Sequence, residues 1–220
     1  MGALLAIDVN RTSSRPGPPA GTDDRVREAT LACIARFGLT KTTLDDIARE
    51  SGVSRATIYR TFPGGREILL QSVVVSEIDR FFTELDARLR AVDGLEDLLT
   101  VGLGASMRFL AEHAALRTIV QVEPGLLLPM FAFHRLDVAL LHAASFAAPH
   151  LEPYLGSADA AWSAAEHLTR IVLTYTMHPD PAVDPSDDAS IRRLVRHLVL
   201  PGLTAGSTVN ESVQPKGTHD

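Results

Sequence analysis

Several features that define other protein classes are scarce or absent in this 220-residue chain. It contains one cysteine, Cys33, which excludes an internal disulfide framework. Its longest apolar stretch, around residues 126–133, is interrupted by Pro129 and flanked by Glu123 and Arg135, so no segment reaches the ~20 apolar residues of a membrane span. The opening residues lack the basic and apolar regions of a secretory signal. These absences predict a cytoplasmic protein without a membrane segment.

Signatures of catalysis and of metal or nucleotide binding are also missing. The chain has no G-x-S-x-G, P-loop or G-x-G-x-x-G motif, and its eight histidines show neither HExxH nor paired-cysteine spacing. Cys33 lies among apolar residues, where a buried thiol is the ordinary outcome. The sequence therefore predicts no enzyme activity, no metal site and no cofactor.

Positive charge is scarce overall but locally concentrated. The net charge of −6 excludes a surface that is basic throughout. Residues 71–220 carry nineteen acidic and eleven basic side chains, whereas residues 22–70 carry seven acidic and eight basic ones. In the second segment Arg55, Arg60 and Arg66 occur with no acidic residue between Ser54 and Arg66. A contact with nucleic acid must therefore come from this local cluster.

Apolar residues recur near every 3.6 positions along most of the chain, and no alternating pattern or hairpin dipeptide indicates a strand. This predicts an all-α fold of about nine helices, with a small N-terminal module and a larger helical domain. The predicted divisions are a flexible arm over 1–21, the module over 22–70, the larger domain over 71–203 and a flexible tail over 204–220. Helices are expected over 23–37, 44–51, 55–62, 66–90, 95–112, 116–122, 129–147, 157–177 and 188–200.

Two details of these helices are specific enough to check. The first helix should bury one face, and the stretch from Pro149 to Gly156 should separate the helix over 129–147 from the next one. The face expected to be buried comprises Val26, Thr30, Cys33 and Phe37.

The stretch from Leu44 to Phe62 has the pattern of a helix-turn-helix. Thr43 and Asp46 have the spacing of a capping box, and Ser54 can cap the following helix. Gly52 permits the tight turn between the two helices. The second helix then presents donors, a methyl-sized contact and an aromatic hydroxyl, which suit base edges and phosphates in a major groove. These outward positions are Arg55, Ala56, Thr57, Tyr59 and Arg60. A helical hairpin whose Arg and Tyr side chains simply cover the surface remains the alternative.

At these positions the sequence resembles the TetR family of bacterial one-component regulators. The resemblance is carried by Thr42-Thr43-Leu44-Asp45-Asp46-Ile47-Ala48-Arg49-Glu50-Ser51-Gly52-Val53-Ser54, by Thr57-Ile58-Tyr59-Arg60 and Phe62-Pro63, and by a preceding helix that ends in Phe37-Gly38. It covers about residues 22–70. Beyond residue 70 the likeness is limited to helical layout and length.

The resemblance implies roles for individual side chains. Thr43 and Tyr59 would contact phosphates, and Thr42 would contact DNA at the helix start. Many members place a phosphate-gripping lysine at the start of the fourth helix, where this chain has Gly64-Gly65-Arg66. Either Arg66 or the glycine amides would then take that contact. The groove-facing residues would be Arg55, Ala56, Thr57 and Arg60.

Dimerisation is expected because paired modules about 34 Å apart can read two successive major grooves. The candidate surface comprises the helices over 157–177 and 188–200, which resemble the pairing helices of the family. Their apolar positions are Trp162, Leu168, Ile171, Val172, Leu194, Leu198 and Val199. An ordinary core within one chain would explain the same residues. The DNA partner would be a double-stranded, palindromic operator.

The larger domain combines aromatic residues, methionines and two histidines with few charges, as an apolar cavity with polar anchors would. Residues expected to line it are Met107, Phe109, His113, Met130, Phe131, His134, Trp162 and Tyr175. Packing of an ordinary core is the alternative for each of them. The sequence thus predicts a repressor that a small, mostly apolar effector releases from DNA. The alternatives are a helical small-molecule-binding protein or enzyme whose hairpin is only structural, and a regulator without a ligand that acts through protein partners.

Overall fold

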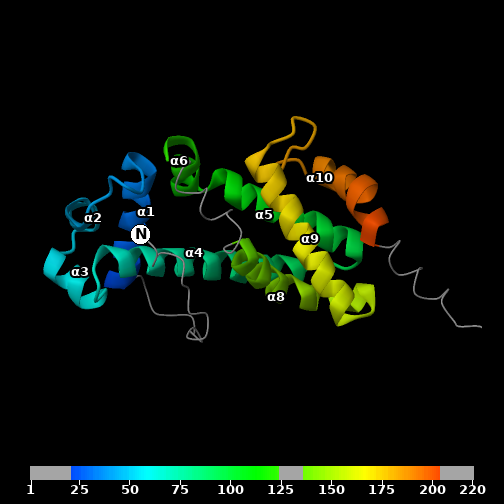
Figure 1. Cartoon of the computed structure of the whole chain (residues 1–220), viewed down its shortest axis with the longest axis horizontal. Coiled ribbons are helices and arrows are strands. Elements are labelled where there is room, and N and C mark those ends of the chain that lie inside the picture. The colour runs from blue at the N-terminus through cyan, green and yellow to red at the C-terminus, as the bar shows by residue number, and fades with distance from the viewer. Residues whose placement is uncertain (1–20, 124–135, 204–220) are drawn as a thin grey trace, which may run out of the picture. The chain divides into compact units, whose positions relative to one another are not determined.

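The computed structural model describes residues 21–123 and 136–203, and within these ranges it contains helices and no strand (Figure 1). The all-α prediction and the N-terminal helix-turn-helix are confirmed. None of the described helices is long and apolar enough to cross a membrane. The helices are α1 (Thr22–Phe37), α2 (Leu44–Ser51), α3 (Arg55–Thr61), α4 (Arg66–Leu89), α5 (Leu95–Glu112), α6 (Ala114–Val122), α8 (Leu136–Leu155), α9 (Ala158–Met177) and α10 (Asp188–Leu194), which continues into a π-helical turn (Val195–Val199).

The chain divides into two compact units. Unit 1 includes residues 21–83 and 112–123, and unit 2 includes residues 84–111 and 137–203. Unit 1 therefore contains the whole predicted helix-turn-helix together with α6, which comes much later in the sequence. The functional boundary expected near residue 70 stays a prediction.

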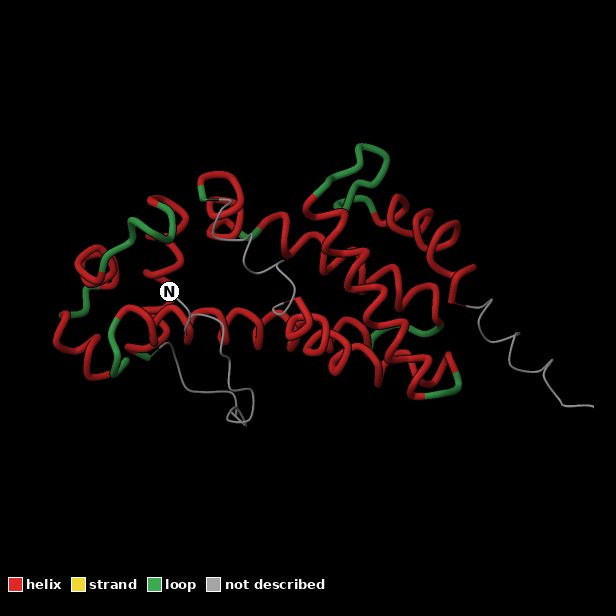
Figure 2. Tube along the Cα trace, viewed as in Figure 1, coloured by secondary structure: helices red, strands yellow, loops and turns green. Residues whose placement is uncertain are grey.

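One apolar cluster holds the N-terminal helices of unit 1 together. α1 packs against α2, and α2 packs against α3 across short loops (Figure 2). Ile47 and Ile58 are fully buried where α2 and α3 meet. The cluster comprises Val26, Ala29, Cys33, Leu44, Ile47, Val53, Ile58, Phe62, Leu69 and Val73. Because α1, α2, α3 and α4 all contribute to it, the geometry of α3 depends on this one core.

A second, smaller cluster fastens α6 to α1. Ile34 of α1, Leu70 of α4 and Ala115 of α6 are buried together, with Leu39 and Ile119 packed against them. The Thr118 hydroxyl donates a 2.8 Å hydrogen bond to the carbonyl of Ala35 in the last turn of α1. The apolar and polar contacts together fix α6 on the end of α1.

Unit 2 joins its helices through small buried residues and an ion-pair network. Ala161, Ala164 and Ala165 of α9 are buried. Arg192 Nη1 lies 2.8 Å from Glu96 Oε1 and 2.6 Å from Asp97 Oδ1, so α10 is linked to the start of α5. Hydrogen bonds from Arg196 and then Arg192 hold the pKa of Glu96 below its usual range.

The helical periodicity misplaced one residue of α1. Val26, Thr30 and Cys33 are buried as expected, but Phe37 is 39% exposed. The Arg36 guanidinium lies 5.5 Å from the centre of the Phe37 ring and covers part of it. Phe37 is the last residue of the helix, and the buried face ends about one turn earlier, at Cys33 and Ile34.

The expected break at Pro149 was wrong, because α8 continues through Pro149 and Pro153 to Leu155. Its buried face, formed by Leu140, Ala144, Ala148 and Leu151, runs past the first proline at helical spacing. The Gly94 amide also donates to the Tyr154 hydroxyl at 3.2 Å, which anchors the last turn. Packing along this face outweighs the hydrogen bonds that the prolines remove.

Candidate nucleic-acid interface

The start of α2 is closed by the predicted capping box. The Thr43 hydroxyl accepts from the Asp46 amide at 3.2 Å, and the Asp46 carboxylate accepts from the Thr43 amide at 3.1 Å. The hydrogen bonds from Thr43, first from its hydroxyl and then from its amide, lower the pKa of Asp46. The local signal for this helix start is therefore confirmed atom by atom.

The turn and the second cap also follow the prediction. Gly52 ends α2 in the left-handed conformation, with φ +67°. Val53 is buried in the turn, and the Ser54 hydroxyl accepts from the Thr57 amide at 3.2 Å. These two caps and the glycine set the direction in which α3 leaves α2.

α3 is anchored on one side and open on the other. Ile58 is 0% exposed in the core of unit 1, whereas Tyr59 is 47% exposed. Arg55, Ala56 and Arg60 are exposed, and Thr57 is half-buried with its hydroxyl 3.0 Å from that of Ser54. The residues predicted to face a groove thus lie on the solvent side of the helix, and their contact with DNA stays a prediction.

Arg55 is held in place before any partner arrives. Its Nη1 lies 3.0 Å and 3.2 Å from the two carboxylate oxygens of Asp45. Hydrogen bonding with Tyr59, followed by the interaction with Asp45, raises the pKa of the Arg55 guanidinium. Asp45 was not among the predicted site residues, although it lies only two positions after the cap residue Thr43.

Tyr59 lies against Gly65, the residue before α4. A Cβ at Gly65 would be only 2.8 Å from Cε1 of the Tyr59 ring, so the glycine makes room for the ring. The ring therefore rests on the start of α4 while nearly half of the side chain stays exposed.

Thr42 and Arg66 face the backbone of the loop before α2. Thr42 is 1% exposed, and its hydroxyl donates to the Gly38 carbonyl at 2.7 Å. Arg66 donates from Nε to the Thr42 carbonyl at 2.9 Å and from Nη2 to the Leu39 carbonyl. Their contacts with DNA stay predictions, but the structure gives both side chains a role in shaping this loop.

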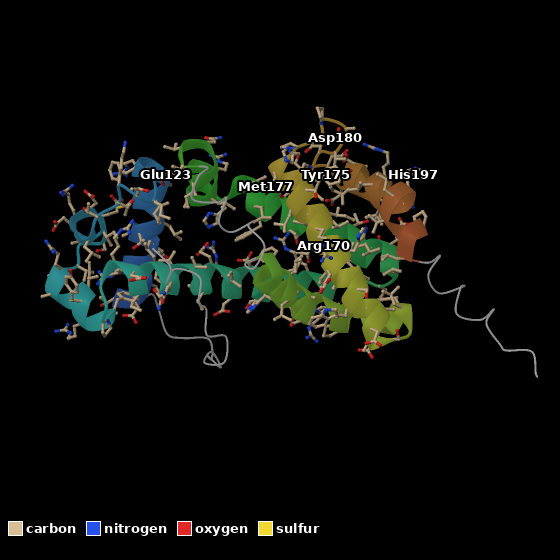
Figure 3. All side chains as sticks on the ribbon, viewed as in Figure 1. Glu123, Arg170, Tyr175, Met177, Asp180 and His197 are labelled. Carbon is tan, nitrogen blue, oxygen red and sulfur yellow. The ribbon has the colours of Figure 1, made fainter. Side chains whose placement is uncertain are left out.

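Glu123 is a residue that the sequence did not reveal. It follows the last residue of α6 (Figure 3), and its carboxylate accepts from the Leu39 amide at 2.6 Å and from the Thr40 amide at 2.9 Å. Burial alone would raise the pKa of Glu123. The hydrogen bonds from Thr40 and Leu39 and the charge of Lys41 together have a larger, opposite effect, so the pKa lies below its usual value. A separation of more than 80 residues hid this contact from any local pattern.

The helix-turn-helix segment is similar to a known family of proteins. Residues 26–72 match the model of the bacterial regulatory proteins of the tetR family. Residues 26–72 therefore form a module of the TetR family. An uncharacterised HTH-type transcriptional regulator of Mycobacterium bovis is 38% identical over 66 residues, which are 30% of this chain and 34% of that protein. The chain thus matches about a third of the length of this relative.

Broader likenesses extend beyond the TetR-family DNA-binding module. The HTH-type transcriptional regulator AlkX of Mycobacterium tuberculosis is 28% identical over 168 residues, covering 72% of this chain and 78% of that protein. The crystal structure of the TetR-family repressor AlkX from a Dietzia strain, implicated in biodegradation of n-alkanes, covers 86% of this chain and 98% of its own, with TM-score 0.60 and 24% identity. The fatty acid degradation regulator FadR of Bacillus halodurans covers 84% and 98%, with TM-score 0.59 and 18% identity. These structures share the fold.

The residues expected to bind an effector fall into three groups. Met107 is buried in α5, while Phe109, Trp162 and Tyr175 are half-buried, the last in the final turn of α9 (Figure 3). His113 caps α6 through Nδ1, and its Nε2 lies 3.0 Å from Glu77 Oε2. Met130, Phe131 and His134 lie outside the described residues. Their common role in effector binding stays a prediction. Among the described residues no group of His, Cys, Asp or Glu side chains could hold a metal ion.

The helices expected to pair two copies are α9 and α10 with its π-helical continuation. Val172, Leu194 and Val199 are buried within the chain, and Leu168 and Ile171 are half-buried. Leu198, by contrast, is 68% exposed. Part of the predicted apolar set therefore packs in the core of one chain, whereas Leu198 lies on the solvent-exposed side of its helix.

Proposed function

We propose that this protein is a dimeric, ligand-responsive transcriptional repressor that reads an operator with α3. The observation that carries the proposal is the outer face of α3, where Arg55, Tyr59 and Arg60 are exposed while Ile58 fixes the helix in the core. An α-helix with its side chains is about 10–12 Å across, which fits a major groove about 12 Å wide. Such a protein acts where the genome is, in the bacterial cytoplasm.

Side-chain chemistry indicates which residues suit the bases and which suit the phosphates. Arg60 can form two hydrogen bonds with guanine, and Ala56 and the methyl group of Thr57 can contact thymine methyl groups. The exposed Tyr59 hydroxyl and Thr43 at the start of α2 suit phosphate oxygens, which fix the register of the helix without reading sequence.

The acidic residues of α2 should repel DNA next to α3 only weakly, because each of them forms an ion pair with an arginine. Asp45 pairs with Arg55 at 3.0 Å, Asp46 with Arg49 at 3.5 Å, and Glu50 with Arg36 at 3.4 Å. Arg60 forms no ion pair with any described residue, so its charge is available to DNA. This local balance supports DNA binding by a chain whose net charge is negative.

Two copies are needed for a specific site, because one module supplies too small a surface. The exposed Leu198, on the helices expected to pair, supports a dimer formed through α9 and α10. A twofold dimer would read a palindromic operator with its two α3 helices.

The effector proposed here is a long-chain aliphatic molecule. Support comes from AlkX, which is related to this chain over 168 residues, and from a fold shared with the alkane-associated AlkX and with FadR. Unit 2 supplies Met107, Phe109 and Trp162 as apolar side chains suited to such a chain.

DNA binding is tested with the full chain and a duplex of its own promoter region. Arg60→Ala combined with Tyr59→Phe should weaken binding about a hundredfold, since each lost contact accounts for roughly a factor of ten. Arg88→Ala removes an exposed arginine near the end of α4 and should leave affinity unchanged. Failure of the wild-type protein to bind at low salt would favour a helical small-molecule-binding protein or enzyme.

Effector binding is tested by the fluorescence of Trp162, the single tryptophan. Adding a long-chain fatty acid or a long-chain n-alkane should change its emission and release the promoter fragment over the same concentration range. A ligand-free regulator that acts through protein partners would show neither response.

A further inference from the structure

The loop between α1 and α2 is gripped on both sides by side chains from distant parts of unit 1. It runs from Gly38 to Thr43 and ends at the residue that starts α2. Glu123 binds its amides at Leu39 and Thr40, and Arg66 binds its carbonyls at Leu39 and Thr42. A carboxylate thus meets donors and a guanidinium meets acceptors, which are the strong pairings for charged groups. We call Glu123 and Arg66 the loop clamp.

The backbone at Gly38 is shaped to admit the carboxylate. A Cβ at Gly38 would lie 3.0 Å from Glu123 Oε2 and 3.2 Å from its carboxyl carbon, and the residue has φ +85°. Any side chain there would meet the carboxylate and would also occupy a conformation that L-residues rarely adopt. The glycine and the glutamate are therefore complementary, although 85 positions separate them.

The clamp bears on the DNA-facing residues through a short, closed path. The Thr42 hydroxyl returns to the Gly38 carbonyl at 2.7 Å, so the loop closes on itself directly before Thr43. Thr43 then caps α2, and α2 packs on α3. A change in the path of Leu39 and Thr40 must alter either this loop or the start of α2.

We propose that Glu123 is a positioning residue for DNA binding: its carboxylate, opposed by Arg66, holds the loop over residues 38–43 in the form that presents Thr43 and α3 to DNA. This inference rests on the proposed function and extends it to a residue outside the helix-turn-helix. Glu123 touches no DNA in this account, and its own negative charge would disfavour binding.

The sign of a substitution separates positioning from simple electrostatics. Glu123→Gln removes a negative charge, which by itself should strengthen binding to a polyanion. It also leaves one acceptor oxygen where two amides need one each. Positioning predicts that affinity for the promoter fragment falls about tenfold, the loss expected from one charge-assisted hydrogen bond. Glu112→Gln is the matched control, because it makes the same charge change at an exposed site in the same unit, and it should leave affinity equal or slightly higher.

Amide hydrogen exchange in the free protein reports the clamp without DNA. In the wild-type chain the Leu39 and Thr40 amides should exchange slowly, and Glu123→Gln should accelerate at least one of them about tenfold while the amides of α2 keep their protection. Gly38→Ala perturbs the clamp from the other side and should act in the same direction. Circular dichroism verifies that the variants keep their helices.

The outcomes are distinct. Faster exchange together with weaker DNA binding in Glu123→Gln supports the inference. Faster exchange with unchanged or stronger DNA binding overturns it and leaves the DNA-reading function intact. Unprotected Leu39 and Thr40 amides in the wild-type protein also overturn it. A wild-type protein that binds no DNA overturns the proposed function, and the exchange data still decide whether the clamp exists.

Discussion

Arg60 of α3 and the arginines of the α10 region are surrounded differently. Arg192 and Arg196 share the Glu96 carboxylate, at 2.8 Å and 2.9 Å, and Arg192 also reaches Asp97. In α3, Arg60 is exposed and forms no ion pair with any described residue. The same type of side chain therefore links helices at Arg192 and at Arg55, which pairs with Asp45, and stays unpaired among the described residues at Arg60. The difference is set by where the acidic residues lie, so the number of arginines alone says little about function.

The largest effect on stability should come from the buried residues of α3 and of the α10 region. Ile58→Ala in α3 and Ile191→Ala in α10 both remove a fully buried side chain and should each lower the free energy of unfolding by about 3 kcal/mol. Denaturant unfolding measures the loss. Under conditions where both variants remain folded and dimeric, Ile58→Ala should weaken DNA binding strongly and Ile191→Ala should not. Equal effects on DNA binding would mean that α3 is not the reading helix.

The next largest effect concerns the solvent-exposed side chains of α3 and of the α10 region. Leu198→Glu places a charge at the exposed apolar position expected to pair two copies, and it should raise the dimer dissociation constant by about tenfold or more. Sedimentation measures the change. Arg60→Ala should leave the dimer intact. A Leu198→Glu protein that remains as dimeric as the wild type would exclude this surface from the interface.

The smallest effect should come from the ion pairs of unit 2. Because the pKa of Glu96 is lowered in the folded chain, its contribution is present above the usual carboxyl pKa of about 4.3 and is lost as pH falls through the folded value. Glu96→Gln should therefore lower the melting temperature slightly at pH 7 and reduce the loss of stability on acidification below about pH 4. A full wild-type pH dependence in Glu96→Gln would assign the acid sensitivity to other carboxyls.

Sequence reasoning succeeded where the physical signal is local. Thr43 with Asp46, Gly52 and Ser54 fix the ends of α2 and α3 through contacts no more than three residues apart. The face of α3 followed directly, since burial of Ile58 determines which neighbours point outward. The described helices, from α1 to the end of α10, agree with the expected all-α fold.

It failed where a distant segment decides the outcome. Nothing near Glu123 in the sequence shows that its carboxylate meets Leu39 and Thr40, and nothing near Arg66 shows that backbone carbonyls occupy its guanidinium. Pro149 illustrates the opposite error, because a local breaker was overruled by the buried face of α8. Tertiary packing outweighs local preference at Pro149, and tertiary hydrogen bonds decide the positions of Glu123 and Arg66.

The salt dependence of binding to a promoter fragment tests the central claim most directly. For a groove reader, the logarithm of the association constant falls linearly with the logarithm of salt concentration. The account predicts that Arg60→Ala weakens binding and reduces the magnitude of this slope by about one, whereas Arg192→Ala, with its arginine already paired to Glu96 and Asp97, leaves the slope unchanged. A slope that is the same in the wild type and in Arg60→Ala would contradict it.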